Sequence, residues 1–264
     1  MRRAGPRRII HGSAIVDPAA RIGSGVSIGP FSVIGPGVEI GDRTSIGSHV
    51  VIEGPTRIGC DNRIFAFSAI GGEPQDKKYH GEPTRLEIGD RNTIREYCTI
   101  HRGTTQDSGT TRIGDDNWIM AYVHVAHDCV VGSHTIFANA ASIAGHSRVD
   151  DWAILGGFTL LHQFCQVGAH AFTSMGSIIS RDVPPFVTVA GNFALPKGIN
   201  TEGLKRRGFS SERILSIKRA YRTIYKSGLP LADARAQLAA AADGAPDVRL
   251  MLDFIERSER SLIR

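Results

Sequence analysis

Histidines are the residues of this sequence best suited to chemistry at neutral pH, because a free imidazole titrates at about pH 6.5. Six of the ten fall in one stretch of the chain: His124, His127, His134, His146, His162 and His170. Two of these histidines stand close together in the segment HVAHDC, where Asp128 directly follows His127. A carboxylate beside an imidazole can orient the ring and stabilise its protonated form. We expect His127 to be a general base with Asp128 as its partner, unless the histidines are only solvated and Asp128 only closes a turn.

A six-residue repeat determines which of these residues can meet in space. Ile or Val occupies every sixth position from Ile10 to Ile70, and the phase returns from Ile88 to Ile100. After a slip of one residue, large apolar side chains recur every six residues from Ile113 to Val167. Each unit is then one short strand and one turn, and three units make a coil that stacks on the next at about 4.8 Å. The repeat predicts an all-β solenoid, a parallel β-helix whose handedness the period alone does not fix.

Residues 18 positions apart stack in one column of such a solenoid. We therefore expect His127, Gly145 and Gln163 one above another, with His146 beside Gly145. An imidazole about 5 Å from a backbone N–H suits acyl transfer, since the base and the oxyanion donor then flank the reacting carbonyl. No nucleophile is evident beside a base, which favours direct transfer over a covalent intermediate.

The same histidines allow a metal-binding alternative, with His124, His127 and His146 as three ligands. No fourth cysteine or carboxylate stands at a spacing familiar from zinc sites, and the four cysteines form no CxxC pair. We expect neither a metal nor another cofactor in this protein.

Two polar segments interrupt the repeat, at about residues 72–87 and 102–112. Loops that interrupt a rigid solenoid usually carry function, because their polar backbone must lie outside it. Asp76, Lys77, Lys78 and Tyr79, in the first segment, are therefore candidate functional residues.

The end of the chain differs in composition and periodicity from the repeat. Apolar positions at 3.6-residue spacing predict helices over about residues 211–227, 231–242 and 247–259. We expect a β-helix domain over residues 1–191 and a C-terminal α-helical domain over residues 192–264.

Composition and charge bound the class of protein. With 41% hydrophobic and 22% charged residues, the chain is too apolar to be disordered, and it has no apolar run of the ~20 residues that a membrane helix needs. The N-terminus lacks the apolar stretch of a secretion signal, so we expect a cytoplasmic protein. The net charge of +5 comes from residues 192–264, with 14 basic against 8 acidic residues, and from the arginines of residues 1–8. A basic surface fits an acidic partner, the alternative being solvated helix faces.

Several stretches of the sequence resemble the acyl-[acyl-carrier-protein]–UDP-N-acetylglucosamine O-acyltransferase family, the first committed enzyme of lipid A synthesis. They include QDKKYHGEPTRLEIGDRN, HVAHDCVVG, HQFCQVGAH and NTEGLKRRGFS, the last being specific to this family among hexapeptide-repeat proteins. The resemblance implies a homotrimer of left-handed β-helices with active sites between subunits. It implies acyl carrier protein as donor and UDP-N-acetylglucosamine as acceptor, with no nucleic-acid partner and no membrane span. Acyl carrier protein would then be the acidic partner.

The resemblance also implies roles for individual residues. His127 would take the proton from the sugar 3-hydroxyl, Asp128 would orient it, and the Gly145 N–H would donate to the thioester oxygen. The other matching positions contact the substrates: Asp76 and Lys78 the sugar, His124 and His146 the reaction centre, Gln163 the acyl chain, and Asn200, Glu202, Arg206 and Arg207 the uridine and diphosphate.

Met175 departs from the family pattern. In the family this position resembles a ruler at the far end of the acyl groove, where Gly admits long chains and bulkier residues shorten them. Unless Met175 only fills space between coils, we expect a shorter (R)-3-hydroxyacyl chain, near C10 rather than C14.

Other activities on the same solenoid stay open at this point. They are a related hexapeptide N- or O-acyltransferase, a 3-amino in place of a 3-hydroxyl sugar acceptor, and a zinc hydratase with three histidine ligands. A purely structural scaffold would leave the histidine-rich coils unexplained.

Overall fold

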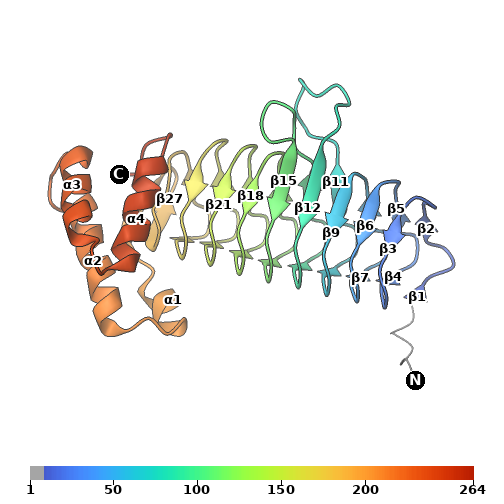
Figure 1. Cartoon of the computed structure of the whole chain (residues 1–264), viewed down its shortest axis with the longest axis horizontal. Coiled ribbons are helices and arrows are strands. Elements are labelled where there is room, and N and C mark those ends of the chain that lie inside the picture. The colour runs from blue at the N-terminus through green and yellow to red at the C-terminus, as the bar shows by residue number, and fades with distance from the viewer. Residues whose placement is uncertain (1–8) are drawn as a thin grey trace.

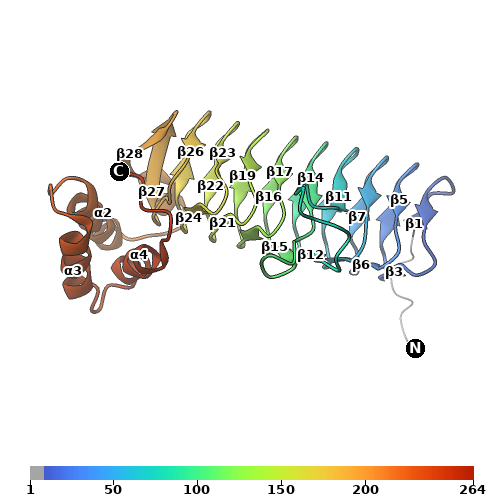
Figure 2. The same cartoon turned by 90° about the horizontal axis from the view of Figure 1, so that it is seen from above.

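The computed structural model describes residues 9–264, so the arginine-rich residues 1–8 lie outside the described part. Within it, short strands and turns alternate from Ile9 onward and build one long solenoid with helices at its C-terminal end (Figures 1 and 2). The described strands form three sheets along the solenoid, and every strand pairs in parallel except the last. The chain is therefore a parallel β-helix, as the six-residue repeat predicts.

Apart from the last two strands, which share a sheet, consecutive strands belong to different sheets, and each full coil contributes one strand to each sheet in turn. The first sheet contains β1 (Ile9–Ile10), β4 (Ser27–Ile28), β7 (Ser45–Ile46), β10 (Arg63–Ile64), β13 (Thr93–Ile94), β16 (Trp118–Ile119), β19 (Ile136–Phe137), β22 (Ile154–Leu155), β25 (Phe172–Thr173), β27 (Val187–Gly191) and β28 (Ala194–Ile199). The second contains β2 (Ile15–Val16), β5 (Val33–Ile34), β8 (Val51–Ile52), β11 (Ala69–Gly72), β14 (Thr99–His101), β17 (His124–Val125), β20 (Ser142–Ile143), β23 (Leu160–Leu161) and β26 (Ile178–Ile179). The third contains β3 (Arg21–Ile22), β6 (Val38–Ile40), β9 (Thr56–Ile58), β12 (Arg85–Ile88), β15 (Thr110–Ile113), β18 (Val130–Val131), β21 (Arg148–Val149) and β24 (Gln166–Val167).

The repeated aliphatic side chain of each strand points into the solenoid. Ile34, Ile52, Ile70 and Ile100 pair in register along the second sheet, and each is at most 1% exposed. Side chains alternate along a strand, so the residue before each of them faces outward. Burying an aliphatic side chain stabilises the fold by ~1.5–3 kcal/mol, and this column of contacts holds successive coils together.

The solenoid turns its corners through residues in the left-handed backbone region. Asp128, His146 and Phe164 occupy successive levels of the corner between the second and third sheets, with φ of 59°, 62° and 65°. Non-glycine residues adopt this conformation uncommonly, and here the pairing of the flanking strands imposes it at these three levels. The 18-residue period of the coil therefore brings distant side chains of this corner together.

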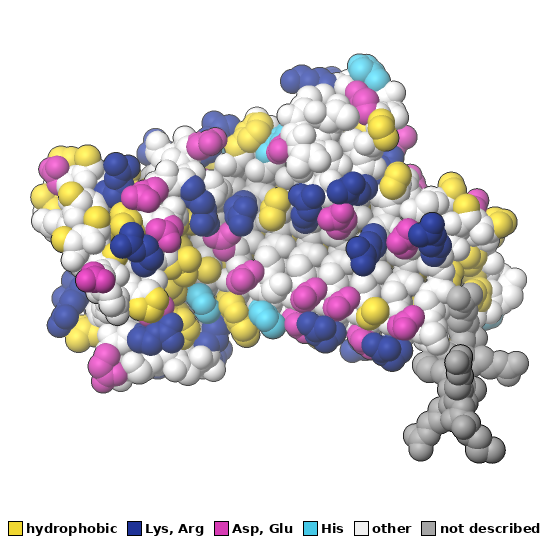
Figure 3. Space-filling view, in the orientation of Figure 1, with side chains coloured by type: hydrophobic (Ala, Val, Ile, Leu, Met, Phe, Trp, Pro, Cys, Tyr) yellow, Lys and Arg dark blue, Asp and Glu magenta, His cyan; other side chains and the backbone are white. Residues whose placement is uncertain are grey.

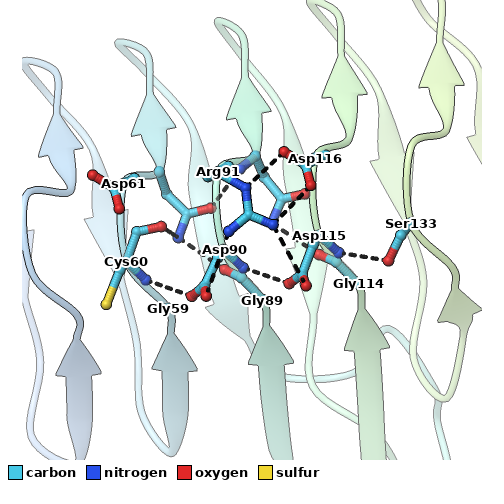
Figure 4. A network of polar contacts seen from close by, with 12 residues as sticks. Gly59, Cys60, Asp61, Gly89, Asp90, Arg91, Gly114, Asp115, Asp116 and Ser133 are labelled. Carbon is cyan, nitrogen blue, oxygen red and sulfur yellow. Dashed lines mark hydrogen bonds and ion pairs between the residues drawn. The ribbon is translucent and has the colours of Figure 1, made fainter.

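The corner between the third and first sheets is held by a ladder of side chains that accept backbone N–H groups (Figure 4). The Asp90 carboxylate accepts the N–H of Cys60, and the Asp115 carboxylate accepts the N–H of Asp90, both at 2.7 Å. Ser133 Oγ accepts the N–H of Asp115 at 3.0 Å. Arg91 lies among the carboxylates and offsets their charge (Figure 4). The ladder satisfies polar backbone groups at the turns and ties each coil to the next.

Two loops leave the solenoid at the corner that carries Asp128 and His146. The first excursion loop, residues 73–84, joins β11 to β12, and the second excursion loop, residues 102–109, joins β14 to β15. Since β11 neighbours β14 and β12 neighbours β15, the two loops rise from adjacent levels on the same side (Figures 1 and 2).

Helices follow the last strand and cover the C-terminal end of the solenoid (Figure 2). Their bounds are α1 (Thr201–Arg206), α2 (Ser211–Tyr225), α3 (Leu231–Ala241) and α4 (Pro246–Arg257). The three longer helices confirm the predicted ones, and Ser210 caps α2 by accepting the N–H of Arg213 at 3.3 Å. The short helix α1 and the antiparallel strand β28 were not predicted from the sequence. In the described part of the chain, no helix is long and apolar enough to cross a membrane.

Candidate active site

His127 and Asp128 form a hydrogen-bonded pair at the corner that follows β17. His127 Nδ1 lies 2.9 Å from Asp128 Oδ2, and the Asp128 carboxylate also accepts the N–H and the hydroxyl of Thr104 at 2.8 and 2.7 Å. Burial alone would raise the pKa of Asp128, but the hydrogen bonds from His127 and Thr104 outweigh it, and the pKa lies below its usual value. An ionised Asp128 favours the tautomer of His127 with a proton on Nδ1, which leaves Nε2 as the basic nitrogen.

Gly145 lies directly against the His127 ring, one coil further along the chain. A Cβ atom built on Gly145 would come within 2.5 Å of His127 Cε1, so only glycine fits beside this imidazole. Within the described residues, no protein acceptor takes the Gly145 N–H. The predicted stacking of His127 and Gly145 is confirmed, and the glycine that lies against the imidazole has an N–H without an acceptor among the described residues.

The excursion loops, the corner and the segment after α4 line an open cavity of about 810 Å³. Of the residues singled out in the sequence, Asp76, Lys78, His127, His146 and Gln163 line it together. The first of these shapes its loop, since the Asp76 carboxylate accepts the N–H of Lys78 at 3.0 Å. Carboxylates, ammonium groups, imidazoles and amides all face this space, so it can bind a polar ligand beside the His127–Asp128 pair.

Arg102 fastens the first excursion loop to the solenoid. Its guanidinium is buried and donates to the carbonyls of Gly71 and Gly54 at 2.6 and 3.1 Å, and to the Tyr79 hydroxyl at 3.3 Å. The Tyr79 hydroxyl in turn donates to the carbonyl of Glu82 at 3.0 Å. Arg102 therefore fixes the first excursion loop, which forms one wall of the cavity, to the solenoid.

His124 lies on β17 and not in the wall of the cavity. Its Nδ1 is 2.8 Å from Thr99 Oγ1, and its ring meets that of His101 edge-on at 5.4 Å. Burial, together with the neighbouring His101 and His127, lowers the pKa of His124 to about 4, so the ring is neutral at pH 7.

The remaining candidate residues lie away from the cavity of their own chain. Asn200 caps α1 by accepting the N–H of Gly203 at 3.1 Å, and Glu202, on α1, pairs with Lys205. Arg206 ends α1, and the Arg207 guanidinium lies over the Trp152 ring at 5.3 Å.

Met175 also lies outside the cavity. It follows β25 on the corner between the first and second sheets, and it is 77% exposed. A single chain therefore does not bring Met175 to the corner that holds His127.

Sequence reasoning missed Asp107 and Glu259, which also line the cavity. Asp107 Oδ2 lies 2.9 Å from His146 Nδ1, although the two residues are 39 positions apart. Asp107 stands in a loop that the broken repeat had marked, but no periodicity indicated its partner. Glu259 follows α4, in a part of the chain where no motif pointed to the site.

One group of donors could hold a cation. The ligand atoms of His127, Asp128 and His146 lie within 4.8 Å of one another. This set differs from the one considered in the sequence, since His124 bonds to Thr99 instead. Both Nδ1 atoms of the group already face carboxylate oxygens, so a cation bound through Nδ1 would displace these hydrogen bonds.

A hexapeptide-repeat solenoid with a histidine–aspartate pair beside a free backbone N–H defines the class, a transferase of the hexapeptide type. In agreement, the model for bacterial transferase hexapeptide repeats matches residues 19–54 and 110–145. The model described as UDP-N-acetylglucosamine O-acyltransferase, domain 2, matches residues 182–263.

Relatives and solved structures identify the family. The acyl-[acyl-carrier-protein]–UDP-N-acetylglucosamine O-acyltransferase of Janthinobacterium sp. (strain Marseille) is 62% identical over 260 residues, which cover 97% of this chain and 99% of the relative. That of Halorhodospira halophila is 62% identical over 255 residues, again covering 97% of this chain and 99% of the relative. Two crystal structures superpose with a TM-score of 0.95: the Francisella novicida UDP-N-acetylglucosamine acyltransferase, 42% identical (97% of this chain, 94% of that one), and the Moraxella catarrhalis O-acyltransferase, 44% identical (97% and 99%). The chain belongs to the acyl-[acyl-carrier-protein]–UDP-N-acetylglucosamine O-acyltransferase family and is an acyltransferase, which confirms the resemblance seen in the sequence.

Proposed function

We propose that this protein transfers an (R)-3-hydroxyacyl group from acyl carrier protein to the 3-hydroxyl of UDP-N-acetylglucosamine, in lipid A biosynthesis. The observation that supports it most directly is the His127–Asp128 pair, with Gly145, whose N–H has no acceptor among the described residues, against the imidazole. Family membership supports the same donor and acceptor.

The proposed reaction is a direct transfer. His127 Nε2 removes the proton from the sugar 3-hydroxyl while the hydroxyl oxygen attacks the thioester carbonyl carbon. The negative charge that develops on the carbonyl oxygen is stabilised by the Gly145 N–H. The C–S bond then breaks, and the imidazolium returns the proton to the departing thiolate. Asp128, ionised and buried, stabilises the imidazolium in between.

The acceptor sugar is proposed to lie in the cavity, against Asp76 and Lys78 of the first excursion loop. His146 would contact the reacting groups and Gln163 the acyl chain, while His124 supports the centre from β17. This placement puts the sugar hydroxyl beside His127.

The uridine and diphosphate are assigned to Asn200, Glu202, Arg206 and Arg207, because a guanidinium matches phosphate oxygens. These residues surround α1 and lie away from the cavity of their own chain. We therefore propose that the site is completed by a neighbouring subunit, in a homotrimer of left-handed β-helices. Met175 would then reach the acyl groove from a neighbour.

The helical domain, proposed over residues 192–264 next to a β-helix domain over residues 1–191, would bind the acidic acyl carrier protein. Its 14 basic against 8 acidic residues support this assignment. Figure 3 shows Lys and Arg side chains on the helical end and along the neighbouring solenoid face, interspersed with Asp and Glu. A cytoplasmic location is part of the proposal, because the donor protein must reach this surface.

The test combines product analysis with one substitution. Purified protein is incubated with UDP-N-acetylglucosamine and a pool of (R)-3-hydroxyacyl carrier proteins, and the products are identified by mass spectrometry. We expect an O-acylated sugar nucleotide, and we expect His127→Ala to lower kcat by ~10²–10⁴-fold, the usual contribution of a general base. His11→Ala, a change at an exposed histidine far from the cavity, serves as the control.

Activity of His127→Ala near that of the wild type would contradict the assignment of the general base. If the protein preferred the 3-amino analogue of the sugar nucleotide, the acceptor group would be an amine and not the proposed 3-hydroxyl. Hydration of carbon dioxide that a chelator abolishes would identify a zinc hydratase instead.

A further inference from the structure

Asp107 lies at the tip of the second excursion loop and reaches the corner beside the His127–Asp128 pair. Its Oδ2 is 2.9 Å from His146 Nδ1, while Asp128 Oδ2 is 3.9 Å from the same nitrogen. Two carboxylates therefore compete for one imidazole, and only the contact with Asp107 has hydrogen-bond length.

The Asp128 oxygen nearest to His146 is already in use. Asp128 Oδ2 faces His127 Nδ1 at 2.9 Å and accepts the Thr104 hydroxyl at 2.7 Å. A third donor at this oxygen would weaken or displace the hydrogen bond that orients His127.

The backbone and the ring of His146 are held in place by their neighbours, so the hydrogen-bond partner of Nδ1 is the feature that can change. Its backbone N–H donates to the carbonyl of His127 at 3.1 Å. One face of its ring stacks on Phe164 with the centroids 4.5 Å apart, and its edge meets the His127 ring at 5.0 Å. If the Asp107 carboxylate is removed, the nearest carboxylate for Nδ1 is that of Asp128.

The loop presents Asp107 in a fixed place. The N–H groups of Asp107 and Gly109 donate to the carbonyl of Thr104 at 3.3 and 3.0 Å, which makes the loop compact. Thr104 is itself anchored to Asp128 through its N–H and its hydroxyl. Asp128 thus holds the base of the loop, and the loop returns Asp107 to His146.

We propose that Asp107 is a positioning residue that holds His146 away from Asp128, so that the Asp128 carboxylate remains available to His127. The inference rests on the proposed general-base role of His127. It assigns to Asp107 an effect on the chemical step and not on substrate binding.

The experiment compares Asp107→Ala with Asp107→Asn in the acyl-transfer assay. We expect Asp107→Ala to lower kcat about tenfold with both KM values within about twofold, because the general base is misoriented while the substrate contacts remain. Asp107→Asn should recover most of the rate, since its amide oxygen can still accept the Nδ1–H of His146. Ser108→Ala, on the same loop, is the matched control and should keep the wild-type kcat.

A double-variant cycle and a crystal structure complete the test. In a His146→Phe background, which lacks the competing nitrogen, Asp107→Ala should have no further effect on kcat. The crystal structure of Asp107→Ala should show His146 Nδ1 within hydrogen-bond distance of Asp128. Wild-type kcat in Asp107→Ala, additive effects in the cycle, or an unmoved His146 would each overturn the inference, whereas absence of acyl transfer by the wild type would instead overturn the proposed function.

Discussion

In the proposed trimer, we expect Met175 to limit the length of the acyl chain that the groove can hold. Its side chain projects from the corner between β25 and β26, and a Cβ on Gly157, one coil earlier, would lie 3.9 Å from its Cγ. A flexible thioether at this position would fill space that glycine leaves open.

We expect Met175→Gly to shift the preference from about C10 toward longer (R)-3-hydroxyacyl chains, because a methionine side chain occupies the length of several methylene groups. The measurement is kcat/KM over a series of acyl carrier thioesters that differ in chain length. The KM for UDP-N-acetylglucosamine should stay unchanged, as a control for the fold. An unaltered chain-length profile would refute the ruler role.

At the residue scale, the sequence predicted contacts that follow the period and missed those that do not. His127 and Gly145 are 18 positions apart, so their contact followed from the length of one coil. The contact of Asp107 with His146 depends on the conformation of a loop that has no period. A contact of this kind can be identified only from the three-dimensional structure of the loop.

At the scale of elements, the six-residue repeat predicted the short strands because one buried aliphatic side chain per strand is a strong and regular signal. Helix α1 has only six residues and depends on the Asn200 cap, which leaves little periodicity to detect. Strand β28 pairs antiparallel with β27 and lies outside the hexapeptide pattern, so the repeat could not predict it. The first excursion loop was located from the broken repeat, but its attachment through Arg102 was not.

We expect Tyr79→Phe to raise the KM for UDP-N-acetylglucosamine about tenfold with little change in kcat. The substitution removes the hydroxyl that joins Arg102 to the first excursion loop, and a hydrogen bond from a charged donor contributes ~1.5–3 kcal/mol. Steady-state kinetics with each substrate varied in turn measures this effect. Tyr97→Phe, at an exposed tyrosine on another corner, is the matched control. An equal fall in kcat would show that the loop affects the reaction itself.

At the scale of the whole molecule, an aromatic column lies exposed along the corner between the first and second sheets. Its rings stack in sequence at 4.9–5.1 Å: Phe31, His49, Phe67, Tyr97 and Tyr122. Phe67 is 48% exposed and Tyr122 is 60% exposed. A long apolar column on one edge suits contact with further copies of the chain, and Met175 lies on the same corner.

We expect Phe67→Glu to dissociate the proposed trimer, because the substitution places a carboxylate in an apolar contact between subunits. Light scattering should give a mass near three chains for the wild type and a smaller one for the variant. Acyl transfer should fall with assembly, since the site is proposed to include a neighbour. Leu215→Glu, at an exposed leucine of α2, should leave the mass unaltered. A Phe67→Glu variant of wild-type mass would exclude the column from the interface.

The two ends of the solenoid are unequal, and this has a consequence for how the molecule melts. In the described part of the chain, Ile10, the inward-facing residue of the first strand, is 41% exposed, whereas β28 and the helices cover the last coil. Because each coil touches only its neighbours, we expect the described coils to lose order one level at a time, starting from the first coil. The levels around His127 lie deep within this stack. Several coils at the N-terminal end can therefore unfold before the coils that hold His127 are affected.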